Sequence, residues 1–320
     1  MSDITIGVIG AGIMGERMLR AALDKAQRSV RVGAVWDPSE AARGRIAATL
    51  RVDLAASAEA LIAASDCVYI ASPPASHLAH AEAALAAGKA VFCEKPLATD
   101  LAAATRFVAA TRSARAAVNF PMATSFSAER IAAWIADGAI GAPRSLAIEV
   151  GFREWPRPWQ HGAVSWLDGR AEGGFTREVI SHFLFLTRRL VGPIALLDST
   201  AEFPDPARSE RAITARLAAG PIEASLKGGV GTTGKDDRNA WTLTGERGAI
   251  RLRDWAIAER LIDGAWVADG EAMPNERARP LVLQRQLAAV AAMTRGEAHP
   301  LASIAEAFDV QRVVEGIVAP

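Results

Sequence analysis

Two short groups of titratable residues in this chain have types and spacings that suit acid–base chemistry. Glu178 and His182 are four residues apart in "GGFTREVISH", so on a helix both side chains lie on one face. A carboxylate there can orient the imidazole and stabilise its protonated form, as general acid–base catalysis requires; the alternative is a histidine satisfied by helix packing. Glu94 and Lys95 stand directly before Pro96 in "VFCEKPLATD", and alone this triplet indicates an exposed salt bridge worth about 0–1 kcal/mol.

A glycine-rich segment near the N-terminus has the spacing of a dinucleotide-binding turn. "GVIGAGIMGERM" places Gly10, Gly12 and Gly15 in a G-x-G-x-x-G pattern after an apolar run, and the acidic Asp37 follows about 20 residues later. We expect Gly10 to permit the tight turn, Gly12 to let the backbone approach a pyrophosphate, and Gly15 to let helix and strand pack closely. The free amides at the helix start would then bind the anion, whereas the alternative is a glycine-rich turn with no ligand.

The predicted cofactor is NAD, with NADP as the alternative. A carboxylate at Asp37 can accept hydrogen bonds from the adenosine ribose and repels a 2′-phosphate. Arg43 and Arg45 follow soon after and weaken this preference, unless they belong to a solvated helix face. The cofactor contacts expected from this motif are Gly10, Gly12, Ile13, Met14, Gly15 and Asp37.

The first third of the chain alternates strand-like and helix-like segments that would position these residues. Short apolar runs, typical of strands covered on both faces, alternate with segments that carry helix-start and helix-stop signals. This alternation predicts a parallel, doubly wound Rossmann sheet with right-handed crossovers. The expected strands are 4–9, 30–36, 67–71, 89–93 and 116–120, and the expected helices end near 25, cover 38–50 and 76–88, and begin at 101.

The rest of the chain has longer strand-like segments in which apolar and polar residues alternate. This pattern is typical of an antiparallel sheet with one wetter face, so we predict an α/β Rossmann domain at 1–120. An α+β domain at 121–320, built on a large, mostly antiparallel sheet, is predicted to follow it. Its expected strands are 144–150, 194–201, 212–217, 222–227, 241–244 and 249–252, and its expected helices lie near 126–138, 175–190, 281–294 and 304–318.

Composition excludes several classes of partner. The chain has 36 basic and 36 acidic residues, so no net charge attracts nucleic acid or an anionic membrane at long range. No signal peptide is apparent, and no apolar run reaches the roughly 20 residues that span a bilayer. Cys67 and Cys93, the only cysteines, lie in strand-like runs and indicate buried thiols in a reducing cytoplasm. His77 and His80 lack a nearby cysteine or acid, so we expect no metal site.

Five motifs occur in a set order along nearly the whole chain. The glycine motif is followed by "ASPPASH" at 71–77, "AGKAVFCEKPLA" at 87–98, "GAIGAPRSL" at 138–146 and "GGFTREVISH" at 173–182. This series resembles the glucose–fructose oxidoreductase/inositol dehydrogenase family, also called Gfo/Idh/MocA. The E-K-P triplet after a Rossmann strand is its most specific element.

The resemblance implies a role for the E-K-P triplet. Lys95 would lie at the carboxyl end of a sheet strand, beside the nicotinamide and facing the substrate, where open α/β sheets bind ligands. Pro96 restricts Lys95 to an extended backbone and so fixes where the ammonium points. Glu94 would pair with Lys95 or brace the loop. The resemblance adds cofactor contacts at Ser72, Pro73, His77, Glu94, Lys95 and Asn119, although a structural role is the alternative for His77.

The chain departs from the family pattern at several positions. Glu178 stands where an aspartate is usual and Ile180 where a glycine is usual, so Glu178 either orients His182 or contacts a substrate hydroxyl itself. Arg177 replaces an aliphatic residue, and is either a salt-bridge partner or a contact for an anionic substrate. The Pro121–Met122 pair stands where an arginine is common, so one polar contact of the usual site is missing.

A proline-broken loop at 152–170 concentrates aromatic residues. Trp155, Trp159 and Trp166 lie in it, and tryptophan faces suit the apolar C–H faces of sugar rings. Packing onto the sheet or onto another subunit is the alternative. Arginines in the same loop suit a carboxylate or phosphate, and His161 is a secondary candidate for the site.

These observations predict an oxidoreductase that transfers a hydride between NAD(P) and a carbinol or carbonyl carbon of a sugar, sugar acid or cyclitol. Lys95, His182 and Glu178 are the predicted catalytic residues, and Lys95, Trp155, Trp159, Trp166, Arg177 and His182 the predicted substrate contacts. The alternatives are an NAD(P)H-dependent reductase of an imine or keto acid, and a non-catalytic dinucleotide-binding sensor. The resemblance also implies that the domain at 121–320 binds substrate and mediates oligomerisation, with a homodimer or homotetramer formed through the C-terminal sheet.

Overall fold

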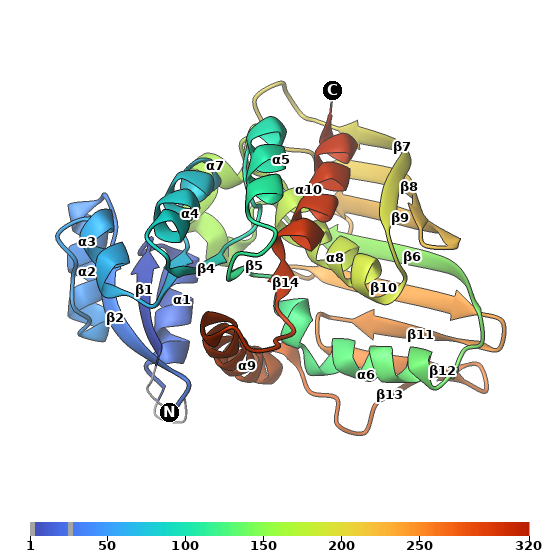
Figure 1. Cartoon of the computed structure of the whole chain (residues 1–320). Coiled ribbons are helices and arrows are strands. Elements are labelled where there is room, and N and C mark those ends of the chain that lie inside the picture. Colours follow the sequence, from blue (N-terminus) through green and yellow to red (C-terminus); the bar gives the residue numbers. More distant parts are fainter. Residues whose placement is uncertain (1–3, 25–27, 320) are drawn as a thin grey trace. The chain divides into compact units, whose positions relative to one another are not determined.

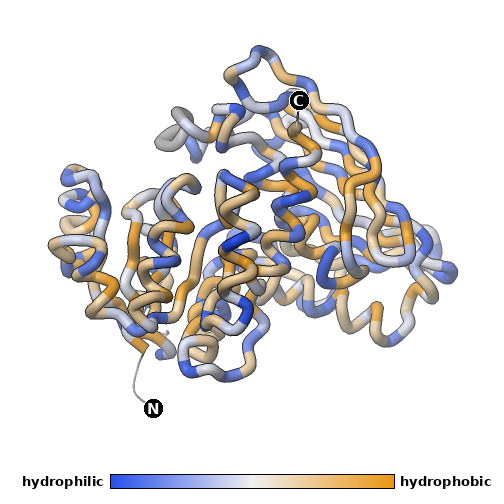
Figure 2. The backbone as a smooth tube through the Cα atoms, turned by 45° about the horizontal axis from the view of Figure 1, so that its top comes forward, coloured by the Kyte–Doolittle hydropathy of each residue, from blue (hydrophilic) through white to orange (hydrophobic). Residues whose placement is uncertain are grey.

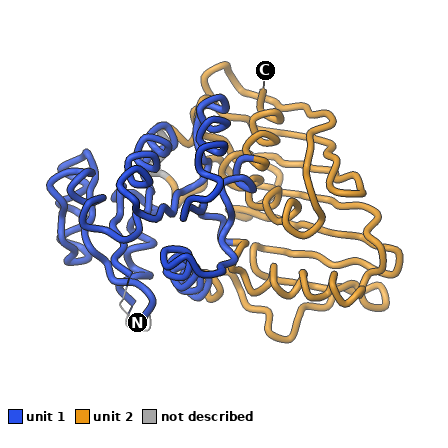
Figure 3. The backbone as a smooth tube through the Cα atoms, in the orientation of Figure 1, with its two compact units in different colours: residues 1–121, 280–308 blue, residues 122–279, 309–320 orange. Residues whose placement is uncertain are grey.

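A computed structural model of the chain describes residues 4–24 and 28–319, with only the backbone described at 161–165 (Figure 1). The chain forms two compact units (Figure 3). The first consists of Met1–Pro121 and Pro280–Phe308, and the second of Met122–Arg279 and Asp309–Pro320. The first unit thus ends next to the boundary predicted after residue 120. The difference is the segment Pro280–Phe308, which was expected in the second domain and belongs to the first unit.

The first unit is built on a six-stranded sheet with the strand order β14-β5-β4-β3-β1-β2. Strands β1 to β5 pair in parallel, and β14 adds an antiparallel edge that the sequence pattern did not predict. The predicted parallel Rossmann sheet is therefore confirmed. The strands are β1 (Ile4–Ile9), β2 (Val30–Trp36), β3 (Cys67–Ile70), β4 (Ala90–Cys93), β5 (Ala116–Val118) and β14 (Ala302–Ser303).

Polar side chains begin three helices of the first unit. Ser39, Ser57 and Asp100 each accept hydrogen bonds from backbone amides of the following first turn. Helix α1 instead begins at Gly12 without a side-chain cap, and it ends at Ala22, whereas its predicted end near residue 25 lies outside the described residues. The helices are α1 (Ile13–Ala22), α2 (Glu40–Leu50), α3 (Ala58–Ala64), α4 (His77–Ala86), α5 (Leu101–Ala110) and most of α9 (Asn275–Arg295).

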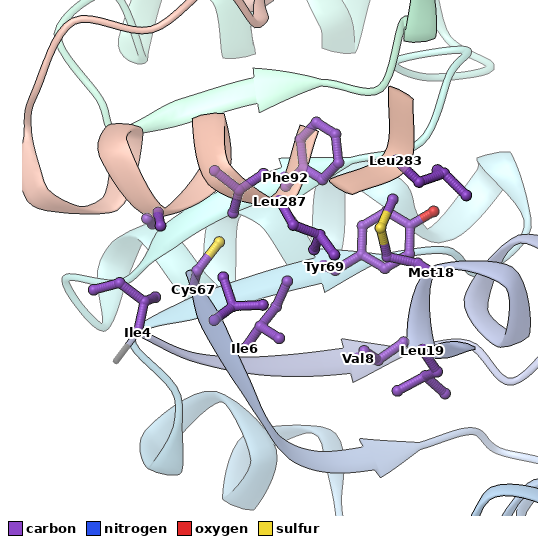
Figure 4. Close-up of a cluster of buried hydrophobic side chains, with 14 of the residues drawn as sticks. Ile4, Ile6, Val8, Met18, Leu19, Cys67, Tyr69, Phe92, Leu283 and Leu287 are labelled. Atoms are coloured by element: carbon purple, nitrogen blue, oxygen red, sulfur yellow. The ribbon is translucent and has the colours of Figure 1, made fainter. Parts of the chain in front are cut away.

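A helix from the far end of the chain completes the core of the first unit. Ile6 of β1, Tyr69 of β3 and Phe92 of β4 are fully buried in one cluster with Leu287 of α9. Figure 4 shows these side chains gathered beneath the helix. Burying a large apolar side chain stabilises the fold by roughly 1.5–3 kcal/mol. Apolar contacts with the sheet therefore explain why Pro280–Phe308 belongs to this unit.

The second unit contains an eight-stranded sheet with the order β13-β12-β11-β10-β6-β9-β8-β7. Its neighbouring strands are antiparallel except β6 and β9, so the predicted mostly antiparallel sheet is confirmed. The last two strands in chain order were not predicted. The strands are β6 (Pro143–Phe152), β7 (Ile194–Glu202), β8 (Ala212–Ala219), β9 (Ile222–Val230), β10 (Arg238–Gly245), β11 (Gly248–Arg253), β12 (Ile257–Ile262) and β13 (Ala265–Ala268).

The two faces of this second sheet differ. Along β8 and β9, buried residues such as Leu217 and Leu226 alternate with exposed ones such as Arg216 and Lys227. Hydrophobic and hydrophilic residues also alternate in colour along the backbone of the chain (Figure 2). Arg216 pairs with Asp198 of the neighbouring strand at 2.7 Å. One face is therefore apolar and covered, whereas the other is charged and open; the subunit contact expected on this face stays a prediction.

The helices of the second unit include one correction to the sequence prediction. The helix expected near 175–190 consists of two parts, a π-helical turn at Thr176–Ile180 followed by α8 (Ser181–Leu190). The other helices are α6 (Phe126–Ala136), α7 (Val164–Leu167) and most of α10 (Ile304–Val318). Within the described residues of the chain, no helix is long and apolar enough to cross a membrane.

Candidate active site

The glycine loop between β1 and α1 has the geometry that its spacing predicts. Gly10 has a φ of +104°, and a Cβ there would lie 2.5 Å from the Ala71 backbone. A Cβ on Gly15 would lie 1.9 Å from the Gly10 carbonyl oxygen, so only glycine permits this approach of helix to strand. By contrast, a Cβ on Gly12 would meet no atom within 4 Å. Gly12 therefore leaves open space at the uncapped start of α1.

The carboxylate of Asp37 is fixed beside this loop at the end of β2. Its Oδ2 accepts a hydrogen bond from Ala11 N and its Oδ1 accepts one from Ser39 N, both at 2.8 Å. Ala11 lies inside the glycine motif, so the segment predicted to bind the pyrophosphate is hydrogen-bonded to the residue predicted to bind the ribose. The remaining lone pairs of the carboxylate can accept ribose hydroxyls.

Glu94 is buried at the end of β4 and is held by a chain of hydrogen bonds within the first unit. Its Oε1 accepts hydrogen bonds from the Tyr69 hydroxyl and from Asn119 Nδ2, the latter at 2.6 Å. Asn119 Oδ1 in turn accepts one from Gln286 Nε2 at 2.5 Å. The donors all point toward Glu94, which suits an ionised carboxylate. Glu94 therefore braces the strand end that precedes Lys95, as one of the two predicted alternatives requires.

This environment also explains the titration of Tyr69, the only tyrosine of the chain. Burial raises the pKa of the Tyr69 phenol well above its ordinary value, and the neighbouring Glu94 charge raises it further. Tyr69 consequently remains a hydrogen-bond donor to Glu94 at neutral pH. Sequence reasoning missed Tyr69 and Gln286, which is one of two glutamines in α9.

Lys95 follows β4 at the carboxyl edge of the parallel sheet and is partly exposed. Its peptide bond to Pro96 is cis. The buried His77 connects this loop to the loop after β3: its Nδ1 lies 2.8 Å from Pro96 O and its Nε2 lies 2.8 Å from Ser72 O. Burial lowers the pKa of His77, with the two carbonyls acting in the opposite direction. His77 thus has the contacts of a structural residue between two loops predicted to bind cofactor.

The segment Gly173–Thr187 of the second unit is buried except at two positions. Those two positions are Glu178 in the π-helical turn and His182 in α8, the pair singled out by spacing. A π-helical turn inside a helix is rare and is frequent at functional sites. The two side chains of this segment that are not buried are therefore a carboxylate and an imidazole one turn apart.

A buried glutamate fixes the start of this segment. Glu210 Oε1 accepts a hydrogen bond from Thr176 N at 2.7 Å, at the N-terminal end of the π-helical turn. Gly174, with a φ of +101°, makes room for the same carboxylate, since a Cβ there would lie 2.2 Å from Glu210 Oε2. Glu210 lies beyond β7 in the sequence, and no spacing rule connects it to the motif.

The His182 ring packs against a tryptophan that the sequence prediction did not include. Its ring centre lies 5.6 Å from that of Trp255, in an edge-to-face arrangement. Trp255 is itself fixed, because its Nε1 donates to Asp237 Oδ1 at 3.0 Å and its backbone N donates to Asn239 Oδ1 at 2.9 Å. These contacts restrict the orientation of the imidazole.

The aromatic loop divides into buried and exposed parts. Trp155 is buried, and its Nε1 donates to Leu167 O at 3.3 Å, so its contacts are those of core packing. Trp166 is partly exposed, and Trp159 is 45% exposed with the Arg157 guanidinium 4.7 Å from its ring centre. The side chain of His161 lies outside the described residues. Trp159 is the tryptophan of this loop with the most surface for a ligand.

Two of the arginines that suggested an anionic substrate, Arg177 and Arg157, have carboxylate partners. Arg177 is buried and makes a two-pronged ion pair with Glu315, with N–O distances of 2.8 and 2.7 Å. Its Nη1 donates to the carbonyls of Arg170 and Gly173. Arg157 Nη1 donates to Asp237 Oδ2 at 2.7 Å. Both side chains therefore have the contacts of structural arginines, and substrate binding by Arg177 stays a prediction.

Comparison with known proteins finds one matching family model, and the match lies within the first unit. Residues 4–120 match the family described as "Oxidoreductase family, NAD-binding Rossmann fold", Gfo/Idh/MocA. The Rossmann domain of this chain is thus similar to that family. The resemblance inferred from the ordered motifs is thereby confirmed over these residues. No curated protein matches the chain.

Solved structures extend the likeness to the fold of nearly the whole chain. An oxidoreductase domain protein from Kribbella flavida has a TM-score of 0.82 at 20% identity, with 99% of this chain and 96% of that chain covered. An inositol dehydrogenase homolog complexed with NAD+ from Azotobacter vinelandii has a TM-score of 0.81 at 21% identity, with 99% of this chain and 95% of that chain covered. A 3-ketoreductase from Actinomadura kijaniata in complex with TDP-benzene and NADP has a TM-score of 0.78 at 19% identity, with 99% of this chain and 98% of that chain covered.

The residues of the Rossmann domain fit the dinucleotide that this oxidoreductase family binds. The open space over Gly12 and the free amides at the start of α1 suit the pyrophosphate, and the fixed carboxylate of Asp37 suits the ribose. When bound, the nicotinamide of such a cofactor accepts or donates a hydride. Among the described residues, no group of three or more histidine, cysteine, aspartate or glutamate side chains is arranged to hold a metal ion.

Proposed function

We propose that this chain is an NAD(P)-dependent dehydrogenase acting on a carbinol or carbonyl carbon of a sugar, sugar acid or cyclitol. The proposal is supported most directly by Glu178 and His182, the two partly exposed side chains of an otherwise buried segment. An acid–base pair kept at the surface of a packed helix, in a chain with an NAD-binding domain, suits proton transfer coupled to hydride transfer. A cytoplasmic homo-oligomer is part of the same proposal.

In the oxidation direction, His182 accepts the hydroxyl proton while the hydride leaves the carbon that bears that hydroxyl. Lys95 donates a hydrogen bond to the same oxygen and stabilises the negative charge that develops on it. Glu178 orients the imidazole and stabilises the imidazolium that forms. Reduction reverses these steps, with His182 returning the proton to the carbonyl oxygen. Trp159 offers an exposed ring for the apolar face of a sugar.

The alternative, reduction of an imine or keto acid, was suggested by arginines suited to a carboxylate. Arg177 and Arg157 pair with Glu315 and Asp237, so neither supplies a specific reason to prefer it. A non-catalytic sensor differs from both enzymes, because it binds dinucleotide but does not convert any substrate.

A screen that follows nicotinamide absorbance separates the three functions. The purified chain is mixed with NAD or NADP and a panel of sugars, sugar acids and cyclitols, and separately with NADH or NADPH and a panel of ketones, keto acids and imines. We expect reduced cofactor to form with a member of the first panel. Turnover confined to keto acids or imines would replace the proposal with the reductase, and tight cofactor binding without any turnover would replace it with the sensor.

A further inference from the structure

A group of charged residues connects the glycine loop to the end of β2 and to α2. The carboxylate of Asp37 is held on one side, by Ala11 N and Ser39 N. Two arginines of α2 bind the same two loop segments through their carbonyls. Arg43 Nη1 donates to Asp37 O and Arg45 Nη2 donates to Ala11 O, both at 2.5 Å. Asp37 and Arg45 are thus bonded to the two ends of one residue, Ala11.

This arrangement places opposing charges around the expected ribose position. The Asp37 carboxylate would repel a 2′-phosphate at this position. The guanidinium groups of Arg43 and Arg45, which donate hydrogen bonds to the neighbouring carbonyls, would attract it. Guanidinium groups are the preferred protein partners of phosphate because their planar forks match its oxygens. The carboxylate alone therefore does not decide between NAD and NADP, and the availability of the arginines matters as well.

Glu16, in the first turn of α1, forms an ion pair with one of these arginines, Arg45. Arg45 Nη1 donates to Glu16 Oε2 at 2.6 Å, and Arg20 donates to Glu16 Oε1 at 2.7 and 3.1 Å. Hydrogen bonds from Arg20 and Arg45 hold the pKa of Glu16 below its ordinary value, so the side chain is ionised at neutral pH. The Glu16 carboxylate consequently competes with any phosphate for the Arg45 guanidinium.

We propose that Glu16 favours NAD over NADP from outside the cofactor site, by holding Arg45 against the glycine loop. The inference rests on the proposed function only in that the chain binds a nicotinamide dinucleotide. The Arg45 side chain is 49% exposed and that of Glu16 is 24% exposed, so the contact is screened by water. An ion pair of this kind changes an affinity by a few-fold at most.

The test compares dissociation constants measured by calorimetry without substrate. The ligands are NAD, NADP, 5′-AMP and adenosine 2′,5′-bisphosphate, so each pair differs only by the 2′-phosphate. Glu16→Gln should lower the ratio of the NADP to the NAD dissociation constant about threefold, because Arg45 is released. Arg45→Gln should raise that ratio only about threefold over wild type, because Glu16 already competes for the guanidinium there. Relative to Glu16→Gln, the double variant should raise the ratio about tenfold, because a released phosphate partner is lost. The double variant should match Arg45→Gln, since Glu16 acts through Arg45.

Glu40→Gln is the matched control, because it removes one exposed negative charge from the first turn of α2. It should leave the ratio unchanged. A ratio that is equal in Glu16→Gln and in the double variant would overturn the inference, as would equal effects of Glu16→Gln and Glu40→Gln. A further Glu16→Gln effect in the Arg45→Gln background would overturn it too. Wild type that binds neither dinucleotide would instead refute the proposed function, so the two failures are distinguishable.

Discussion

The glycine loop of the first unit and the segment Gly173–Thr187 of the second are both assigned to the reaction, yet they are built in opposite ways. The loop functions through missing side chains: Gly10 and Gly15 have no room for a Cβ, and Gly12 faces open space. The segment functions through two side chains at the surface of a buried stretch, Glu178 and His182.

The two regions also differ in what holds them. The loop is determined mainly by close backbone approaches, of Gly15 to Gly10 within the loop and of Gly10 to Ala71 after β3, and its glycines follow a short spacing pattern. The segment depends on partners far away in the sequence, namely Glu210 at its start and Trp255 against the imidazole. A site made of backbone can therefore be recognised from sequence, whereas the support of a site made of side chains cannot.

The largest effect is expected inside the glycine loop. Gly15→Ala should lower the free energy of unfolding by about 3 kcal/mol, because its Cβ would overlap the Gly10 carbonyl. Gly12→Ala should leave that free energy almost unchanged but weaken NAD binding at least about tenfold, because its Cβ enters only the space left for the cofactor. Urea unfolding and calorimetry measure the two quantities. Equal loss of stability in both variants would remove the distinction between packing and binding glycines.

The next effect concerns the segment in the second unit. His182→Ala should lower kcat about a thousandfold, because it removes the proton acceptor, and Glu178→Gln should be less damaging. If Glu178 orients His182, the double variant should be little slower than His182→Ala. Steady-state kinetics of the four proteins measure this. Losses that multiply, with a raised KM for Glu178→Gln, would instead indicate that Glu178 contacts the substrate.

A smaller catalytic effect is expected at the edge of the parallel sheet. Lys95→Ala should lower kcat about a hundredfold while NAD affinity stays within a few-fold, because the ammonium acts on the reacting oxygen. Lys89→Ala is the matched control: Lys89 precedes the same strand β4 at its other end and donates to Ala63 O at 3.0 Å. Near-normal turnover of Lys95→Ala, or an equal loss in Lys89→Ala, would return the E-K-P triplet to a structural role.

The smallest effect is a pH dependence of stability. Burial lowers the pKa of folded His77 below the ordinary value of 6.5, so below that pH the unfolded chain binds a proton that the folded chain does not. The free energy of unfolding should therefore fall as pH drops below about 6.5. His77→Asn should make the change of the unfolding free energy with pH shallower. The half-buried His80 provides a control, because His80→Asn should reduce this pH dependence less than His77→Asn does. Identical slopes in wild type and His77→Asn would contradict the assignment.

Local sequence patterns were sufficient for much of the fold. The apolar run Ile4–Ile9 and the helix Ile304–Val318 begin and end where the sequence pattern predicted. The return of Pro280–Phe308 to the first unit was not predicted, because a helix's apolar residues do not show which sheet they cover. The short strands of β13 and β14, and the turn of π-helix at Thr176–Ile180, have too few residues for a periodic signal.

In the candidate site, too, features encoded by local sequence were predicted, whereas contacts between distant residues were not. The family motif singled out Glu178 and His182, and their spacing predicts that both side chains lie on one helical face. The interaction of Glu94 with Tyr69 and Gln286, and that of Arg177 with Glu315, join residues from distant parts of the chain. Such pairings depend on tertiary structure, so the sequence left Arg177 open between a salt bridge and a substrate contact.

The account's central claim is that a hydride passes between a carbinol carbon and the nicotinamide. The direct test uses the best substrate of the absorbance screen, carrying deuterium on its carbinol carbon, with NAD or NADP. Mass spectrometry or NMR of the reduced cofactor should find the deuterium on its nicotinamide ring, and the label should appear far more slowly with His182→Ala. Deuterium that stays in the organic product, or a cofactor that remains oxidised although it is bound, would contradict the claim.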